Sequence, residues 1–187
     1  VFIMLVKRAM SKNVVSVSVP GNREKVLDLM RKEDKAVLPV VKGDTKQLVG
    51  LITRSDLIVN PDEEQIAILM STDLVTASPD DDVKDVAKKM IDNNVRRVPV
   101  VDDNGDLVGI ITSFDLVSNA LIKLESDDPV ENFMITTVPT TWYKTPLNVA
   151  FETMKQFGLK SVLALNDSAK LVGILTETDF IEESEII

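Results

Sequence analysis

The chain has 187 residues, 44% of them hydrophobic, so it is long enough for one ordinary domain or two small ones with a real core. The 30 acidic residues outnumber the 21 basic ones, and the net charge of -9 makes nucleic acid and anionic membranes poor partners. Cysteine and histidine are both absent, which excludes disulfides, thiol chemistry, histidine triads and the usual transition-metal ligands.

The first ten residues, VFIMLVKRAM, predict a short amphipathic segment that ends at Met10. Their apolar run is too short to span a bilayer and lacks the basic-then-apolar order of a secretory signal. Because there is also no cysteine to form disulfides, we expect a cytoplasmic protein with no membrane partner.

The residues that follow predict a β-α-β-β-α unit. A β-rich stretch covers 14–19, and a helix with apolar residues spaced by three and four covers 23–32. Two β-branched runs, 37–41 and 48–53, are joined by KGDTKQ, which has the composition of a turn. A second helix begins near Thr53.

The same order of elements returns twice more. Three marker methionines can be placed in register, namely Met10, Met70 and Met134. A glycine follows forty residues later in the first copy and thirty-nine residues later in the other two, at Gly50, Gly109 and Gly173. Such agreement over many positions indicates three units of about sixty residues each.

The predicted fold class is therefore α+β, built from tandem repeats. The expected boundaries are 1–60 for repeat one, 61–124 for repeat two and 125–187 for repeat three. A three-stranded sheet with two helices buries little surface by itself, so the repeats should pack in pairs.

These residues resemble cystathionine-β-synthase (CBS) domains. The resemblance rests on the marker methionine, the turn that ends in Pro79, the segment RRVPVVD and the phrase GIITSFDL, and it covers nearly the whole chain. It implies that repeats one and two pair through their sheets as a Bateman module. It also implies a regulatory protein that binds AMP, ADP or ATP, or alternatively S-adenosylmethionine or NAD, between repeats.

The number of repeats departs from the family pattern. The chain is similar to four-repeat CBS proteins, including the γ subunit of AMP-activated protein kinase, and we expect the fourth repeat to be absent or truncated. Either the sequence is a fragment, or repeat three pairs with a copy in another chain. By resemblance, a homodimer is expected, and both alternatives leave an apolar face that something else must cover.

A threonine and an aspartate stand three residues apart in each copy of one phrase. The pairs are Thr53 and Asp56, Thr112 and Asp115, and Thr176 and Asp179. One interpretation is a capping box at the start of the second helix, with aspartate in place of glutamate. The other is a ligand site, where the helix start and the threonine hydroxyl face a phosphate and the aspartate accepts from ribose hydroxyls. The two interpretations are compatible.

Basic residues distinguish the three copies. Arg96 and Arg97 precede Pro99, whereas the matching pairs are Ala36 with Val37, and Lys160 with Ser161. In the γ subunit that the chain resembles, a basic pair at these offsets contacts phosphate in the cleft whose aspartate comes from the partner repeat. The resemblance therefore assigns Arg96 and Arg97 to the site of Thr53 and Asp56.

The same resemblance completes the first site. Leu51, Leu74 and Val75 align with positions that line the base pocket, and Arg54 adds positive charge at the helix start.

The reciprocal site of Thr112 and Asp115 has no matching cations and is expected to bind a less charged adenosyl compound or nothing. The third site, Thr176 and Asp179, lacks half its walls.

Other candidate features favour structural interpretations. The acidic segment Pro79–Asp85 lacks the loop of alternating ligands that a calcium site needs, so no metal site is assigned. Trp142 and Tyr143 could stack on a base, but packing of a loop or an interface explains them more simply.

The function expected is thus that of an adenine-nucleotide-binding regulatory module with an adenosyl ligand, no catalytic cofactor and a client protein that the sequence does not identify. The chain offers no nucleophile and base at a recognisable spacing, so an enzyme is not expected. An interaction scaffold with vestigial pockets is the alternative.

Overall fold

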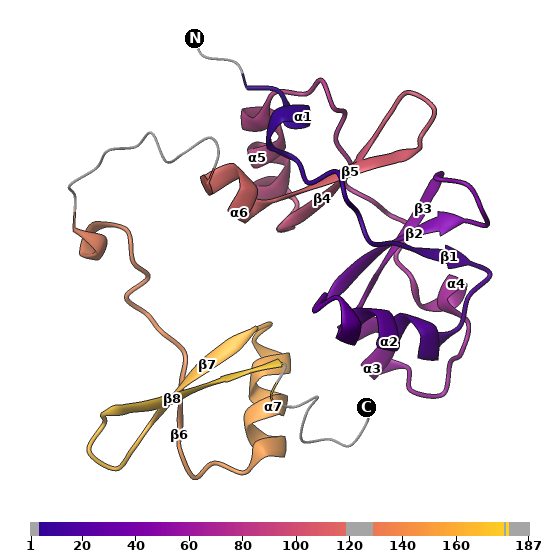
Figure 1. The fold of residues 1–187 in the computed structure, drawn as a ribbon. Helices are drawn as coiled ribbons and strands as arrows, with labels where there is room; N and C mark the ends of the chain where they lie inside the picture. Colours follow the sequence, from indigo (N-terminus) through magenta and orange to yellow (C-terminus); the bar gives the residue numbers. More distant parts are fainter. Residues whose placement is uncertain (1–3, 119–128, 178, 180–187) are drawn as a thin grey trace. The chain divides into compact units, whose positions relative to one another are not determined.

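The computed structural model describes residues 4–118, 129–177 and 179, and the chain divides into two compact units, Val1–Glu125 and Ser126–Ile187. The first unit holds repeats one and two and the second holds repeat three (Figure 1). Within the described ranges, no helix has the length and apolar character needed to cross a membrane.

Repeat one forms a three-stranded sheet in the order β1-β2-β3, with β1 Val17–Val19, β2 Val37–Lys42 and β3 Leu48–Thr53. The first pair of strands is parallel and the second pair is antiparallel. Helix α2, Arg23–Lys32, connects β1 to β2, and its first turn is capped by Asn22, whose side chain accepts from the Lys25 N–H at 3.1 Å. Helix α3, Arg54–Val59, follows β3 directly.

Repeat two has the same elements with a weaker first strand. It contains α4 Ile66–Leu69, α5 Val83–Asp92, β4 Arg97–Val101, β5 Leu107–Thr112 and α6 Ser113–Leu116. The expected strand before α5 is reduced to one parallel bridge between Ala77 and Val100. The reason lies at Pro79, which has no N–H to continue the ladder, whereas Tyr143, at the matching position of repeat three, donates to the Leu165 carbonyl at 2.9 Å.

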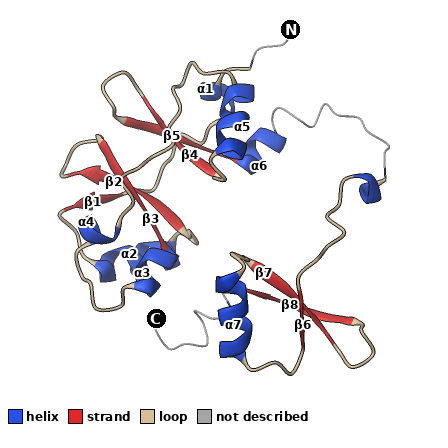
Figure 2. Ribbon diagram, turned by 180° about the vertical axis from the view of Figure 1, so that it is seen from behind, coloured by secondary structure: helices blue, strands red, loops and turns tan. Residues whose placement is uncertain are grey.

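Repeat three builds its own sheet in the order β6-β7-β8. Its strands are Thr140–Trp142, Ser161–Leu165 and Leu171–Thr176, and α7, Leu147–Gln156, connects the first two. A register shift occurs after Val40, Val100 and Ala164, which is the same position in each antiparallel pair. The three-repeat α+β prediction is therefore confirmed in the backbone, and Figure 2 shows the helices against their sheets.

Repeats one and two exchange their leading segments. Helix α1, Val6–Ala9, belongs to the core of repeat two, where Val6 packs in one cluster with Val86 of α5 (Figure 1). Conversely, Ile66 of α4 lies in the core of repeat one with Val26 and Ile52. Each repeat thus fills the hydrophobic core of the other, which explains why neither needs a large core of its own.

Backbone hydrogen bonds join the two repeats at matching positions. Ser11 exchanges two bonds with Ile110 of β5, at 2.9 and 3.0 Å, and Ser71 does the same with Leu51 of β3. The two hairpins also pair, since the Leu107 N–H donates to the Lys46 carbonyl at 2.8 Å. These contacts form the paired-sheet Bateman arrangement that the resemblance implied.

A methionine lies against a glycine at both exchange points. A Cβ added to Gly109 would stand 2.4 Å from the Met10 sulfur, and one added to Gly50 would stand 2.5 Å from the Met70 sulfur. Only a residue without a side chain lets the leading segment approach the last strand this closely. The recurring glycine of the phrase is therefore half of a contact between repeats.

We predict that Gly109→Ala lowers the free energy of unfolding of the first unit by about 1–3 kcal/mol, because the new methyl group overlaps Met10. Circular dichroism should detect the loss. Trp142, the one tryptophan of the chain, lies in the second unit. Its fluorescence therefore provides an internal control that should not change. In a Met10→Ala background the cost should fall, and an equal cost in both backgrounds would contradict the contact.

Candidate functional site

The Thr-x-x-Asp pairs form capping boxes in the structure. The Asp56 Oδ2 accepts from the Thr53 N–H and from the Thr53 hydroxyl, both at 2.7 Å, and the Asp56 N–H donates back to Thr53 Oγ1 at 3.2 Å. Thr112 and Asp115 repeat this geometry at 2.8, 2.6 and 3.1 Å. The helix-capping interpretation is thus correct for both pairs.

Capping limits what the start of α3 can offer a ligand. A hydroxyl has one proton, and that of Thr53 points at Asp56, so it cannot also donate to a phosphate while the cap is intact. The Arg54 N–H is taken as well, since it donates to the Ala36 carbonyl at 2.9 Å. The expectation that the threonine and the helix start supply phosphate donors therefore has weak support in this geometry.

The Asp56 carboxylate keeps part of its capacity. Both bonds from Thr53 go to Oδ2, and no described residue donates to Oδ1. The carboxylate is half-buried and held in one orientation by its own cap. It can still accept hydrogen bonds from hydroxyl groups of a ligand that approaches from the Oδ1 side.

The segment 71–77 connects β3, the strand that leads into the Asp56 cap, to β4 of repeat two. It begins at Ser71, hydrogen-bonded to Leu51 of β3, and ends at Ala77, bridged to Val100 of β4. Leu74 and Val75, which were assigned to the base pocket, lie midway along it and are half-buried. The topology thus brings Leu51, Leu74 and Val75 to the boundary between the repeats, near the strand that ends at Thr53.

Arg96 and Arg97 lie at the start of β4. The strand register places Arg97 opposite Thr112, and the Arg96 carbonyl accepts from the Ser113 N–H at 2.9 Å. Both side chains are exposed, and among the described residues neither makes an ion pair or a side-chain hydrogen bond. No described contact joins either arginine to Thr53 or Asp56, so their assignment to that site stays a prediction.

Repeat three keeps the contact between threonine and aspartate but differs in its basic residue. The Asp179 Oδ2 accepts from the Thr176 N–H at 2.7 Å and from its hydroxyl at 2.8 Å. These two bonds, the hydroxyl first, hold the pKa of Asp179 below its ordinary value. Lys160, at the position of Arg96, pairs with Glu177 at 2.8 Å, so its charge is already balanced.

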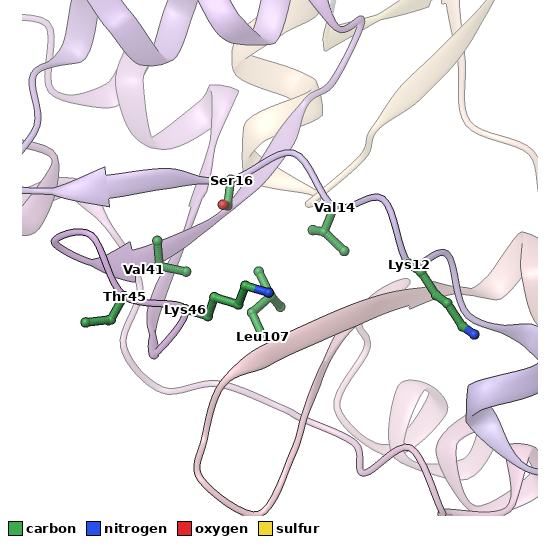
Figure 3. Close-up of a pocket in the computed structure, with 7 residues that line it drawn as sticks. All are labelled: Lys12, Val14, Ser16, Val41, Thr45, Lys46 and Leu107. Carbon is green, nitrogen blue, oxygen red and sulfur yellow. The ribbon is translucent and has the colours of Figure 1, made fainter.

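A hollow of about 200 Å³ lies at the opposite, hairpin end of the paired repeats and was missed by the sequence analysis (Figure 3). It is lined by Lys12, Val14, Ser16, Val41, Thr45, Lys46 and Leu107. In Figure 3 the Lys46 side chain extends toward Leu107, from the turn between β2 and β3. Both lysines are exposed, and the repeat pattern does not single them out, since Lys12 corresponds to Thr72.

The other candidates have structural partners. In the acidic segment Pro79–Asp85, Asp80 pairs with Lys7, Asp81 pairs with Lys89 and Asp82 caps α5. No group of three or more carboxylates suited to a metal ion occurs among residues 4–118, 129–177 and 179.

The aromatic pair of repeat three packs a loop. Trp142 donates from Nε1 to Asp167 on the β7–β8 turn at 2.8 Å, and its ring meets that of Tyr143 edge to face at 5.6 Å. The Lys144 ammonium lies over both rings. These contacts favour loop packing over stacking on a base.

Comparison with known proteins identifies the repeats. The family model of the CBS domain matches residues 6–61, 64–121 and 130–185. Protein MJ1225 of Methanocaldococcus jannaschii is 23% identical over 97% of this chain and 71% of that protein. Its crystal structure, described as that of a proposed archaeal homologue of g-AMPK, has a TM-score of 0.84 at 22% identity over 96% of this chain and 72% of that one, a likeness that shows the fold alone.

Two solved structures with bound ligands are also similar. The CBS domain pair of protein MJ0100, in complex with 5′-methylthioadenosine and S-adenosyl-L-methionine, is 32% identical with a TM-score of 0.56 over 62% of this chain and 98% of that one. The cytosolic domain of the Mg²⁺ channel MgtE, in complex with ATP, is 32% identical with a TM-score of 0.54 over 58% and 46%. The chain spans 43–44% of the length of three other archaeal relatives.

We predict that Thr176→Val raises the pKa of Asp179 toward its ordinary value, because the largest cause of the lowering is lost while the backbone bond remains. NMR titration of the Asp179 carboxyl measures this. Since the folded pKa is the lower one, the cap is complete above the unfolded carboxyl pKa and is lost as the pH falls through the folded value. An unchanged pKa in the variant would show that the hydroxyl is not the cause.

Proposed function

The chain belongs to the CBS-domain family, and from that premise we propose that repeats one and two form a regulatory module that binds an adenine nucleotide. The ligand would lie at the boundary between the repeats, between Asp56 and the start of β4. The module would act in the cytoplasm on a client protein and carry out no chemistry itself. The repeat boundaries 1–60, 61–124 and 125–187 remain part of this proposal, and the junction between repeats two and three, at 124 and 125, lies outside the described residues.

The ribose would be held by Asp56. Its Oδ1 is available to ligand hydroxyls, while the cap on Oδ2 keeps the carboxylate from turning away. A carboxylate oriented in advance loses less conformational entropy when a ligand binds. Leu51, Leu74 and Val75 supply apolar surface for the base on the same side of the repeat boundary.

The observation that carries the proposal is the pair of unpartnered guanidinium groups at Arg96 and Arg97. In a chain with a net charge of -9, two adjacent arginines without an acidic partner among the described residues are an uncompensated positive site. Guanidinium groups match phosphate oxygens in geometry and charge. Because the start of α3 offers few free donors, the arginines would supply most of the phosphate recognition.

Similar proteins support an adenosyl ligand. The two CBS structures at 32% identity hold ATP in one case, and 5′-methylthioadenosine with S-adenosylmethionine in the other. These ligands share an adenosyl group and differ in the charge attached to it. The repeats of this chain also differ in charge, at the position of the basic pair. We therefore propose that this pair selects the ligand.

A second ligand is favoured at the reciprocal site. Thr112 and Asp115 have the same cap, but Ala36 and Val37 stand where the first site has its arginines. A site whose partner strand supplies Ala36 and Val37 in place of two arginines suits an adenosyl compound without phosphates, such as S-adenosylmethionine. We propose that this site binds such a compound more tightly than it binds ATP.

We predict that Arg97→Ala weakens AMP and ATP by about 10- to 150-fold, the loss of one charge-assisted bond of about 1.5–3 kcal/mol. Adenosine should bind almost as before. The measurement is the dependence of the melting temperature on ligand concentration, which reports affinity through mass action. Arg31→Ala is the matched control, because Arg31 is an exposed arginine of α2 that pairs with Asp28.

Three outcomes would contradict this proposal. Equal weakening of adenosine and AMP would show that Arg97 does not contact phosphate. No stabilisation by AMP, ADP, ATP, NAD or S-adenosylmethionine at millimolar concentration would favour an interaction scaffold with vestigial pockets. Turnover of a nucleotide, abolished by Asp56→Asn, would indicate an enzyme instead.

A further inference from the structure

Arg23 is the one charged residue that is buried among the described residues, with 8% of its surface exposed. It is the first residue of α2, and its guanidinium makes no ion pair in the described part of the chain. The corresponding residues of repeats two and three are the apolar Val83 and Leu147. Burial of a charged group is costly, so packing alone does not explain an arginine at this position.

The Arg23 side chain contacts the far end of α3. Its Nη1 donates to the carbonyl of Asn60, the residue that follows α3, at 3.0 Å, and the Glu63 N–H donates to the same oxygen at 3.3 Å. The Arg23 N–H also donates to the Glu64 carbonyl at 2.9 Å. Helices α2 and α3 lie side by side (Figure 1 and Figure 2), so the first residue of one helix holds the chain that leaves the other.

Only the side-chain half of this contact is specific to repeat one. In repeat two, the Val83 N–H donates to the Met4 carbonyl at 2.9 Å. This bond matches the one from the Arg23 N–H to Glu64. Because a valine side chain has no donor, the two copies of the contact differ by the guanidinium.

The C-terminal ends of the following helices differ between the same two repeats. The Val117 N–H after α6 donates back to the carbonyls of Phe114 and Ser113, and each of the other described α-helices except α3 closes with a similar bond. The Asn60 N–H makes no such bond, and α3 has no basic residue in its last turn. Carbonyls at a helix C-terminus carry negative partial charge, so an open end favours a cation. Arg23 supplies that cation from α2.

The acidic linker after α3 adds to the need for a cation. Asp62, Glu63 and Glu64 follow directly after Pro61. Negative charge beside a helix C-terminus is unfavourable. The guanidinium of Arg23 offsets this charge at the point where the linker begins.

We propose that Arg23 is a positioning residue for Asp56. By closing the C-terminal end of α3, it keeps the carboxylate of the first turn in the orientation that a ribose needs. The part of this role that concerns a ligand rests on the function proposed above, whereas the closure of α3 does not. Helix α3 has six residues, far fewer than a helix needs for stability by itself, so release of one end also loosens the turn that carries Asp56.

Hydrogen exchange of the ligand-free protein tests the closure. The Thr53 N–H donates to Asp56 Oδ2, and the Thr112 N–H makes the matching bond to Asp115, so these amides report the two carboxylates within one molecule. The variant Arg23→Val introduces the apolar side chain found in repeat two. We expect Thr53 in this variant to exchange about tenfold faster relative to Thr112. Arg23→Lys keeps a charged donor and should recover part of the protection.

Arg31→Val is the matched control. Arg31 is an exposed arginine in the last turn of the same helix and pairs with Asp28. Its removal changes the net charge by the same amount and should leave the ratio of the two exchange rates unchanged. Because that ratio compares two repeats that we expect to fold together, a general loss of stability in Arg23→Val would affect both amides and leave the ratio unchanged.

Adenosine binding separates positioning from phosphate recognition. Arg23→Val should weaken adenosine, AMP and ATP alike, by about 3- to 10-fold, because all three contain the ribose that Asp56 would hold. Arg97→Ala, by contrast, is expected to weaken only AMP and ATP. The dependence of the melting temperature on ligand concentration measures each affinity.

The outcomes for Arg23 and for the nucleotide function can be told apart. An unchanged exchange ratio in Arg23→Val would overturn the proposal, whatever ligands bind. A raised ratio with undiminished adenosine affinity would show that the closure does not position Asp56, and would also overturn it. If the parent chain binds no adenosyl ligand, the proposed function is wrong, and the exchange ratio still decides whether Arg23 closes α3.

Discussion

The first unit depends on one close contact, made twice, between a methionine of one repeat and a glycine of the other. Met10 against Gly109 and Met70 against Gly50 allow each leading segment to hydrogen-bond to the partner's last strand. That approach in turn carries Val6 and Ile66 into the partner's core. Neither repeat completes its core alone, so we expect the two repeats of the first unit to fold together.

The same exchange creates the boundary where a ligand would bind. Because Ser71 is attached to β3 of repeat one and Ala77 to β4 of repeat two, the segment between them joins the strand that leads into the Asp56 cap to the strand that begins beside Arg96. A nucleotide that contacts both ends would favour one relative position of the repeats over others. Regulation then requires only that the ligand bind one of these positions more tightly.

Periodicity was sufficient to predict the three repeats, their α+β order and the capping boxes. It could not show the exchange, because identical copies have the same pattern whether a methionine meets the glycine of its own repeat or of its neighbour. The loss of the first strand in repeat two was also missed, although Pro79 signals it through its missing N–H. The hairpin hollow at Lys12 and Lys46 has no repeated counterpart from which it could have been recognised.

The recurrence of Thr-x-x-Asp is explained by the fold and cannot by itself indicate a ligand. All three aspartates accept from their threonine, so the motif would persist in a repeat that binds nothing. Selectivity among ligands must come from positions that differ between copies. These positions differ in charge among the copies: Arg96 and Arg97 have no ion-pair partner among the described residues, Ala36 and Val37 are apolar, and Lys160 pairs with Glu177. We propose that the cap keeps each carboxylate in place and that the pair from the partner repeat determines what can bind beside it.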